Sequence, residues 1–338
     1  MAMYCGIDLH SNNGYVVIMD ELLNQVAERR LGNDLRNYLR FLEPHREELV
    51  SIGVESTYNW YWLVDGLKES DYNVRLMNPS KASNLKELKH TGDRHDAGWI
   101  ATMQVLGIMP EGYIMPPEER CLRDLLRRRS FMVKERGRIL KSMQNVFARS
   151  AGKQVSSDQL LKWDTDMIKA ALKDPLVAES VLVLVPVVRT LTAQIHALER
   201  LALQHGRLRE EFSVLQTAKG IGNVLAMAIM CETGDIGRFP SAGDYVSYCR
   251  CCSTGRVTNN KLKGKGNKKN GNKYLSWAYS EAGHFARIHD QIIGRYYKRV
   301  LKHRHPMVAK AKVAAKISRG CFYVLRDQVP FDSQRAFR

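Results

Sequence analysis

The chain has 338 residues, of which 44% are hydrophobic, and this apolar content is enough to build the cores of two or three domains. A disordered chain and a minimal peptide are therefore excluded. The longest apolar run, residues 181–188, contains Pro186 and is far shorter than the ~20 residues of a membrane span. The N-terminal segment has no signal or transit pattern, and seven cysteines do not indicate a disulfide framework. We expect a soluble cytoplasmic protein with no membrane partner.

Charge is the most informative bulk property. The 52 Lys and Arg outnumber the 35 Asp and Glu and give a net charge of +17. The excess is uneven: residues 1–115 carry −5, residues 116–212 carry +6 and residues 213–338 carry +16. We take these three ranges as three domains. The distribution indicates a polyanionic partner, with carboxylate chemistry at one end of the chain and phosphate binding at the other. A solvated basic tail is disfavoured because aromatic and apolar residues run through the last range.

The first of these domains begins as a β-hairpin. Residues 3–19 alternate apolar and polar side chains around the polar turn 10–13, which is the pattern of two antiparallel strands. After the hairpin we predict strands at 49–54 and 73–77 and helices at 35–42, 61–70 and 94–107. This order predicts a mixed α/β sheet with helices on its faces.

The middle of the chain is predicted to be helical. Apolar residues recur every three or four positions between 118 and 211, and a second such run at 182–203 has Pro186 as its start or as a kink. A polar stretch connects the two runs. The pair fits either a helical hairpin or a dimerising coiled coil.

The last domain is predicted to be mainly helical around a basic loop. Helices are expected at 223–232 and over much of 274–325. Between them lies a segment with seven basic residues, no acid and many Asn and Gly: Arg256, Lys261, Lys263, Lys265, Lys268, Lys269 and Lys273. Such a composition does not build a core, and we expect a flexible loop that contacts phosphates.

Four carboxylates could form a metal site. Asp8 and Glu55 end predicted strands, and Asp93 and Asp96 are spaced i, i+3 at a helix start, so the two aspartates share a helical face. If the strands are neighbours, all four can converge. Oxygen ligands of this kind suit Mg²⁺, or Mn²⁺, in phosphodiester chemistry. Each carboxylate alone would be read as a surface or capping residue.

The sequence also resembles a known family. GIDLH at Asp8, VEST at Glu55 and LKHTGDRHDA around Asp93 and Asp96 resemble the DEDD-type transposases of bacterial insertion sequence family 110 and its 1111 subgroup. The segments KGIGNVLAMAIMCETGDIGRFPSAGDYVSYCRC and KGKGNKKNGNKYLSWAYSEAGHFA are similar to the second conserved domain of that family. The resemblance covers nearly the whole chain.

This resemblance implies a fold, a site and partners. It implies a RuvC-like ribonuclease H fold with a D-E-D-D site at Asp8, Glu55, Asp93 and Asp96. It also implies a helical linker that forms dimers to tetramers, and a transposase domain with a hydroxyl nucleophile. The implied activity is RNA-guided DNA recombination in the bacterial cytoplasm. The implied partners are donor and target DNA and a structured non-coding bridge RNA that pairs with both.

The family nucleophile is a serine, and this chain departs from that pattern. An ungapped count of about 19 residues from Phe239 reaches Thr258. Threonine keeps the hydroxyl but adds a β-methyl group that restricts its rotamers. Ser253 is the alternative if the alignment slips.

Two other segments could bind nucleic acid. Lys219-Gly220-Ile221-Gly222 resembles the turn of a helix-hairpin-helix, in which backbone amides approach a phosphate, although a plain tight turn fits as well. The run Arg127, Arg128 and Arg129 lies on a predicted helix and suits a nucleic-acid backbone, with a solvated face as the alternative.

Three other functions compete with a recombinase. A Holliday-junction resolvase-like endonuclease would use water and form no covalent adduct. A non-enzymatic nucleic-acid binder would bind without metal-dependent strand transfer. A sugar-kinase-like phosphotransferase is suggested by GIDLHSNNG, but the charge of +16 over residues 213–338 argues against a small-molecule substrate.

Overall fold

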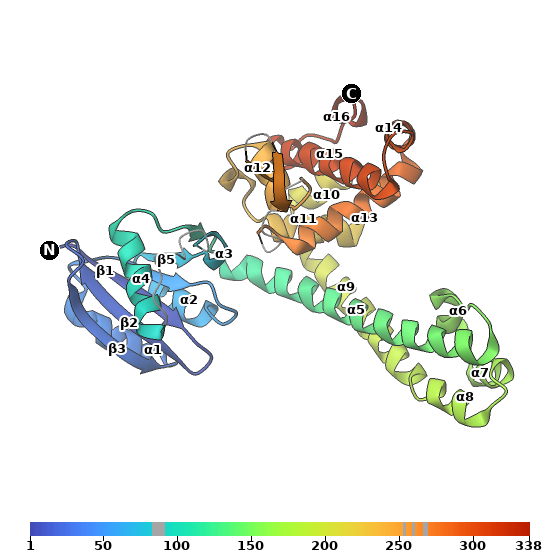
Figure 1. The fold of residues 1–338 in the computed structure, drawn as a ribbon, viewed down its shortest axis with the longest axis horizontal. Coiled ribbons are helices and arrows are strands. Elements are labelled where there is room, and N and C mark those ends of the chain that lie inside the picture. The colour runs from blue at the N-terminus through green and yellow to red at the C-terminus, as the bar shows by residue number, and fades with distance from the viewer. Residues whose placement is uncertain (83–91, 253–254, 259–260, 266–269) are drawn as a thin grey trace. The chain divides into compact units, whose positions relative to one another are not determined.

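The chain divides into two compact units in the computed structural model, which describes residues 1–82, 92–252, 255–258, 261–265 and 270–338. The N-terminal unit comprises Met1–Pro117, and the C-terminal unit begins at Glu118. Each is described by itself below (Figure 1).

A six-stranded mixed sheet forms the centre of the N-terminal unit. Its strands lie in the order β3-β2-β1-β4-β5-β6. Strands β1, β2 and β3 are antiparallel, β4 and β5 run parallel to β1, and β6 is antiparallel to β5. The strands are β1 (Met3–Leu9), β2 (Asn13–Asp20), β3 (Gln25–Gly32), β4 (Leu49–Glu55), β5 (Val74–Met77) and β6 (Glu111–Gly112). The helices are α1 (Leu35–Leu42), α2 (Tyr61–Glu69), α3 (Pro79–Ala82) and α4 (Asp93–Val105). The predicted mixed α/β fold is confirmed.

Helices cover both faces of this sheet (Figure 1). Side chains alternate between the faces along a strand. On β1, Cys5, Ile7 and Leu9 pack in one cluster with buried residues of α1 and α2. Gly6 faces the other way, toward α4. Asp8 shares the face of Gly6 and therefore lies on the α4 side of the sheet.

Two glycines let α4 pack directly on the central strands. Gly6 and Gly53 are register partners on β1 and β4. A Cβ atom at Gly6 would clash with the backbone of α4, and one at Gly53 would lie 2.6 Å from Gln104 Nε2. The buried Gln104 donates to the Cys5 carbonyl at 2.7 Å and accepts from the Ser51 hydroxyl at 2.8 Å. These contacts fix α4 along β1 and β4.

The C-terminal unit starts with a long helical hairpin. Helices α5 (Pro117–Ala151) and α9 (Val185–Gly206) are antiparallel, as the pairs Arg129–Glu199 and Arg136–Thr192 require. Pro186 lies in the first turn of α9, so it starts the helix. The predicted polar connection contains three short helices: α6 (Ser157–Lys162), α7 (Thr165–Ala171) and α8 (Pro175–Leu182). They pack with α5 around Phe147. The stretch Pro175–Gly206 has the length and apolar composition of a membrane span, but in the structure it comprises two helices, α8 and α9.

Seven further helices surround a second core. Tyr245, Tyr279 and Phe322 are fully buried there, and the two tyrosine hydroxyls lie 2.7 Å apart. The helices are α10 (Glu210–Leu215), α11 (Asn223–Thr233), α12 (Ala242–Tyr248), α13 (Lys273–His289), α14 (Gln291–Leu301), α15 (Pro306–Asp327) and α16 (Ser333–Ala336). The prediction of a mainly helical C-terminal region is confirmed.

One strand was not predicted, and one prediction about local structure was wrong. Strand β3 was not predicted, because most of its side chains are polar and only Leu31 is buried. The expected flexible loop contains a two-stranded hairpin, β7 (Gly255–Thr258) and β8 (Lys261–Lys265), in which Thr258 pairs with Lys261. Such a ribbon satisfies its backbone hydrogen bonds between the strands, so it can form without an apolar pattern.

Candidate functional site

Acidic residues converge at one edge of the N-terminal sheet. Ile7 and Val54 are partners on the parallel strands β1 and β4, so the next residues, Asp8 and Glu55, end the strands at the same level. Each lies two residues beyond a glycine that faces α4, so both side chains leave the sheet on the α4 side. A hydrogen bond joins the two carboxyl groups.

The first turn of α4 brings two more carboxylates to this edge. Asp93 and Asp96 occupy that turn, where the positive end of the helix dipole stabilises negative charge. His10 Nε2 lies 3.2 Å from Asp8 Oδ2 and 3.3 Å from Asp93 Oδ1. One ligand atom each from Asp8, His10 and Asp93 lies within 4.8 Å of the others. The charge of Asp96 is close enough to raise the pKa of Asp8.

Asp8 is under electrostatic strain. Its surface is only 3% exposed. Burial is the main cause that raises its pKa to about 7, followed by the hydrogen bond with Glu55 and the charges of Glu55 and Asp96, while His10 acts in the opposite direction. A cation would relieve the repulsion among these groups. Carboxylate oxygens with one imidazole form a donor set that fits a divalent metal ion.

Two residues of this site were missed from the sequence. His10 was treated as part of a turn, although its position two residues after Asp8 is a signal that could have been used. Arg30 Nη2 binds Asp93 Oδ2 at 2.8 Å. Arg30 belongs to β3, so no sequence signal placed it here. Together His10 and Arg30 hold Asp93 at the edge of the sheet.

The candidate nucleophiles belong to the C-terminal unit. Thr258 is the last residue of β7, at the end of the hairpin, while Ser253 lies outside the described residues. The basic residues predicted to contact phosphates are distributed along the same segment. Arg256 is on β7, Lys261, Lys263 and Lys265 are on β8, Lys273 begins α13, and Lys268 and Lys269 lie outside the described residues.

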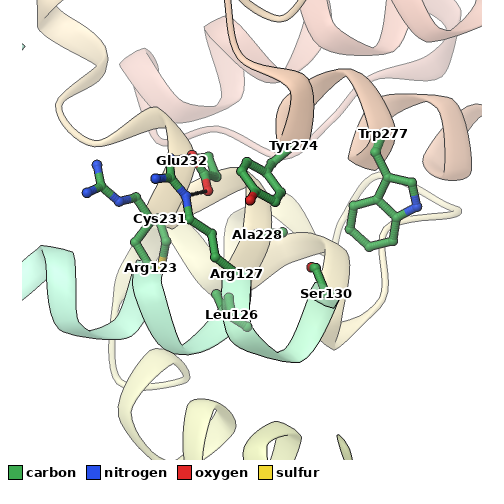
Figure 2. Close-up of a pocket in the computed structure, with 9 residues that line it drawn as sticks. All are labelled: Arg123, Leu126, Arg127, Ser130, Ala228, Cys231, Glu232, Tyr274 and Trp277. Atoms are coloured by element: carbon green, nitrogen blue, oxygen red, sulfur yellow. Dashed lines mark hydrogen bonds and ion pairs between the residues drawn. The ribbon is translucent and has the colours of Figure 1, made fainter. Parts of the chain in front are cut away.

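A buried network holds the chain where it leaves this segment, and Figure 2 shows its Arg127, Glu232 and Tyr274 side chains. Glu232 on α11 is 4% exposed and accepts from Arg127 Nε and Nη2 at 2.6 and 2.7 Å. It also accepts from Asn272 Nδ2 at 2.7 Å. Asn272 caps α13 by accepting from the backbone amides of Tyr274 and Leu275. Arg127 lies over the Tyr274 ring at 4.9 Å. This network joins α5, α11 and the start of α13, which follows the hairpin.

The arginine run on α5 has partners within the protein. Arg127 pairs with Glu232, and Arg129 pairs with Glu199 at 2.6 Å. Arg128 lies 5.9 Å from the Phe131 ring centre. Two of the three side chains therefore have a structural role, and binding of nucleic acid by the run stays a prediction.

The glycine-rich turn packs against α13. Gly220 has φ of +101°, and a Cβ atom there would lie 2.5 Å from the Ala286 nitrogen. Gly222 precedes α11 as its N-cap and provides no side-chain cap. The turn lines an open groove with Phe285 and His289. The backbone N–H groups in the first turn of α11 have no acceptor within the helix, as in the first turn of any α-helix. Lys219 is close enough to Asp290 to help lower the pKa of that carboxyl.

The fold and the acidic edge define a ribonuclease H-like DEDD domain followed by a mainly helical region. Comparison with protein families agrees: a transposase model for the DEDD domain of IS110 elements matches residues 5–150, and a model described as "Transposase IS116/IS110/IS902 family" matches residues 212–298. Together they cover well over half of the chain, which belongs to the IS110 family of transposases and is therefore an enzyme of DNA phosphoryl transfer. No curated protein matches the chain.

Proposed function

We propose that this transposase is an RNA-guided DNA recombinase of the 1111 subgroup that cuts and rejoins DNA through a covalent protein–DNA intermediate. The observation that carries the proposal is the convergence of Asp8, Glu55 and Asp93 at one edge of the sheet, with a buried acid at its centre. We assign the DEDD chemistry to residues 1–115, oligomerisation to 116–212 and the covalent step to 213–338.

Asp8, Glu55, Asp93 and Asp96 would hold the metal, Mg²⁺ or Mn²⁺. When bound, such ions activate a nucleophile and stabilise the leaving oxygen. The protein contributes orientation and charge. Burial keeps Asp8 in one position, and His10 and Arg30 hold Asp93 at the end of α4. Above about pH 7 Asp8 is ionised and can act as a ligand.

Thr258 is our candidate nucleophile. A hydroxyl group attacks once its proton is removed. Its oxygen would form a bond to the scissile phosphorus, the phosphorus–oxygen bond to the leaving strand would break, and that oxygen would take up a proton. Two features support Thr258: it ends β7 at the tip of a basic ribbon, and the Glu232–Asn272 hydrogen bond fixes the chain after the ribbon. Ser253 remains the alternative.

The partners are inferred from charge and exposure. The C-terminal excess of +16 suits donor and target DNA together with a bridge RNA. Phe131 on α5 and Val187 and Leu201 on α9 are exposed apolar residues of the long hairpin, which supports its use in dimers to tetramers. We expect the protein to act in the bacterial cytoplasm.

The covalent step can be tested with the full chain. Purified protein, its co-purifying RNA, DNA substrates and Mg²⁺ should give a protein–DNA adduct that survives denaturing electrophoresis. Thr258→Ala should abolish the adduct, Thr258→Ser should preserve it, and Ser253→Ala should have a modest effect. An adduct in the Thr258→Ala variant would refute the assignment. Cleavage without any adduct would favour the resolvase-like alternative, and sequencing of the co-purified nucleic acid tests guidance by RNA.

A further inference from the structure

The last two long helices carry a basic surface that none of the sites above uses. Residues 291–326 contain ten Lys and Arg and no Asp or Glu, and they form α14, the turn after it and α15. Nine of the ten side chains are exposed, and only Lys316 is half-buried. The segment therefore presents positive charge to solvent over two helices.

On α14 the charges share one face. Arg295, Lys298, Arg299 and Lys302 follow the spacing i, i+3, i+4, i+7. The core contacts of α14 are made from the opposite side, where Ile293 and Tyr297 are buried. The four basic side chains consequently point away from the protein.

The positive charges of α15 meet those of α14 around Tyr296. Arg299 and Lys316 each lie 5.3 Å from the centre of the Tyr296 ring. Arg319 follows Lys316 by one helical turn. Burial, and then repulsion from Arg299 and Arg319, lower the pKa of Lys316, so these like charges are close together. Lys316 also donates to the main-chain oxygen of Ala336 at 2.9 Å.

Within the part of the chain that the structure describes, acidic residues do not neutralise this surface. The nearest acids in sequence have other partners: Asp290 caps α14 and binds Ser333, and Asp327 pairs with Arg326. The exposed residues that make no ion pair with any residue that the structure describes include Arg295, Lys298, Arg299, Lys302, Lys312 and Arg319. We call these six the α14–α15 basic face. Clustered like charges without counter-charges favour a polyanionic partner.

We propose that the α14–α15 basic face is a docking surface for the phosphate backbone of duplex DNA. Arg295 and Lys302 are separated by about 10 Å along α14, since a helix rises about 1.5 Å per residue, and a duplex offers a charge every ~1.7 Å of its axis. Tyr296 lies between cations and is half-buried, so its ring is not offered to a base for stacking. Contacts to the backbone position DNA without reading its sequence. DNA is the polyanion on which this transposase family acts.

The test removes three charges from the face in the full chain. Arg295→Gln, Lys298→Gln and Lys302→Gln are combined, because all three side chains are exposed. A matched control combines Lys141→Gln, Arg149→Gln and Lys153→Gln, which remove the same charge from exposed positions on and just after α5. Binding to a fluorescent DNA duplex is measured by anisotropy over a range of NaCl concentrations. An RNA duplex and anionic vesicles serve as separate arms.

On duplex DNA, the plot of log affinity against log salt concentration should have a slope that is shallower by about two to three units for the variant of the α14–α15 basic face than for the wild type. The expected change is about 0.9 for each phosphate contact that is lost. The control variant should change the slope by less than about one. Equal slopes for the two variants would overturn the proposal, as would a loss confined to the RNA duplex or to the vesicles. Neither result would bear on the DEDD site or on Thr258, which the adduct assay tests separately.

Discussion

Replacing Asp8 by Asn should stabilise the metal-free protein at alkaline pH. The folded carboxyl has its pKa raised to about 7, against 3.8 for an unperturbed aspartate. Between about pH 4 and 7 the folded state therefore binds more protons than the unfolded state, so the stability of the wild type falls as the pH rises. At about 1.36 kcal/mol for each pH unit, the full cost at pH 8 is about 4 kcal/mol. Because part of this cost comes from the interaction of Asp8 with its charged neighbours and not from Asp8 alone, we assign about half of it, ~2 kcal/mol, to Asp8.

Asparagine keeps the shape of the side chain and has no charge to desolvate. In the presence of EDTA the Asp8→Asn variant should melt about 5–10 °C above the wild type at pH 8, and its advantage should shrink steadily toward pH 5. Differential scanning calorimetry of the full chain at several pH values measures this. Glu47→Gln, which removes an exposed acid of the same unit, is the control and should change little. An advantage that does not vary with pH, or a variant that is less stable at pH 8, would refute the argument.

Two further substitutions test how the sites are built. Glu232→Gln leaves the Arg127 cation without its partner, and we expect a loss of about 2–3 kcal/mol in urea unfolding, less than for a fully buried pair because Arg127 is partly exposed. Glu135→Gln breaks the exposed pair with Arg138 and should cost about 0.5 kcal/mol or less, so equal losses would count against the network. Gly53→Ala should cost about 1–3 kcal/mol and weaken metal binding, because the new methyl group pushes against Gln104 on α4. Gly32→Ala, with its nearest atom 3.9 Å away, should be nearly neutral in the same unfolding and metal-binding assays.

The acidic edge could be predicted because local patterns determine most of it. Apolar alternation marks β1 and β4, and residues that end parallel neighbours meet at one edge of a sheet. The spacing of Asp93 and Asp96 places them on one helical face. The packing of α4 was not predictable in the same way, because it depends on Gly6 and Gly53 being register partners, and pairing between distant strands leaves no local pattern.

What escaped prediction shares one physical cause, the absence of a local apolar signal. Strand β3 has mostly polar side chains, buries only Leu31 and is defined by its pairing with β2, so Arg30 could not be placed beside Asp93. The hairpin of β7 and β8 is likewise held by backbone pairing. Arg127 and Glu232 are 105 residues apart. A helical arginine looks the same in sequence whether it meets a phosphate or a buried carboxylate.

Metal binding at the acidic edge is the central claim, and titration of Mn²⁺ into the full chain followed by electron paramagnetic resonance tests it most directly. The wild type should bind Mn²⁺, and Asp8→Asn should weaken the binding by at least about tenfold, equivalent to ~1.4 kcal/mol, because it removes the buried ligand at the centre of the cluster. Glu47→Gln should bind as the wild type does. Equal affinity in the wild type and the Asp8→Asn variant would contradict the account, because the metal would then lie elsewhere in the chain.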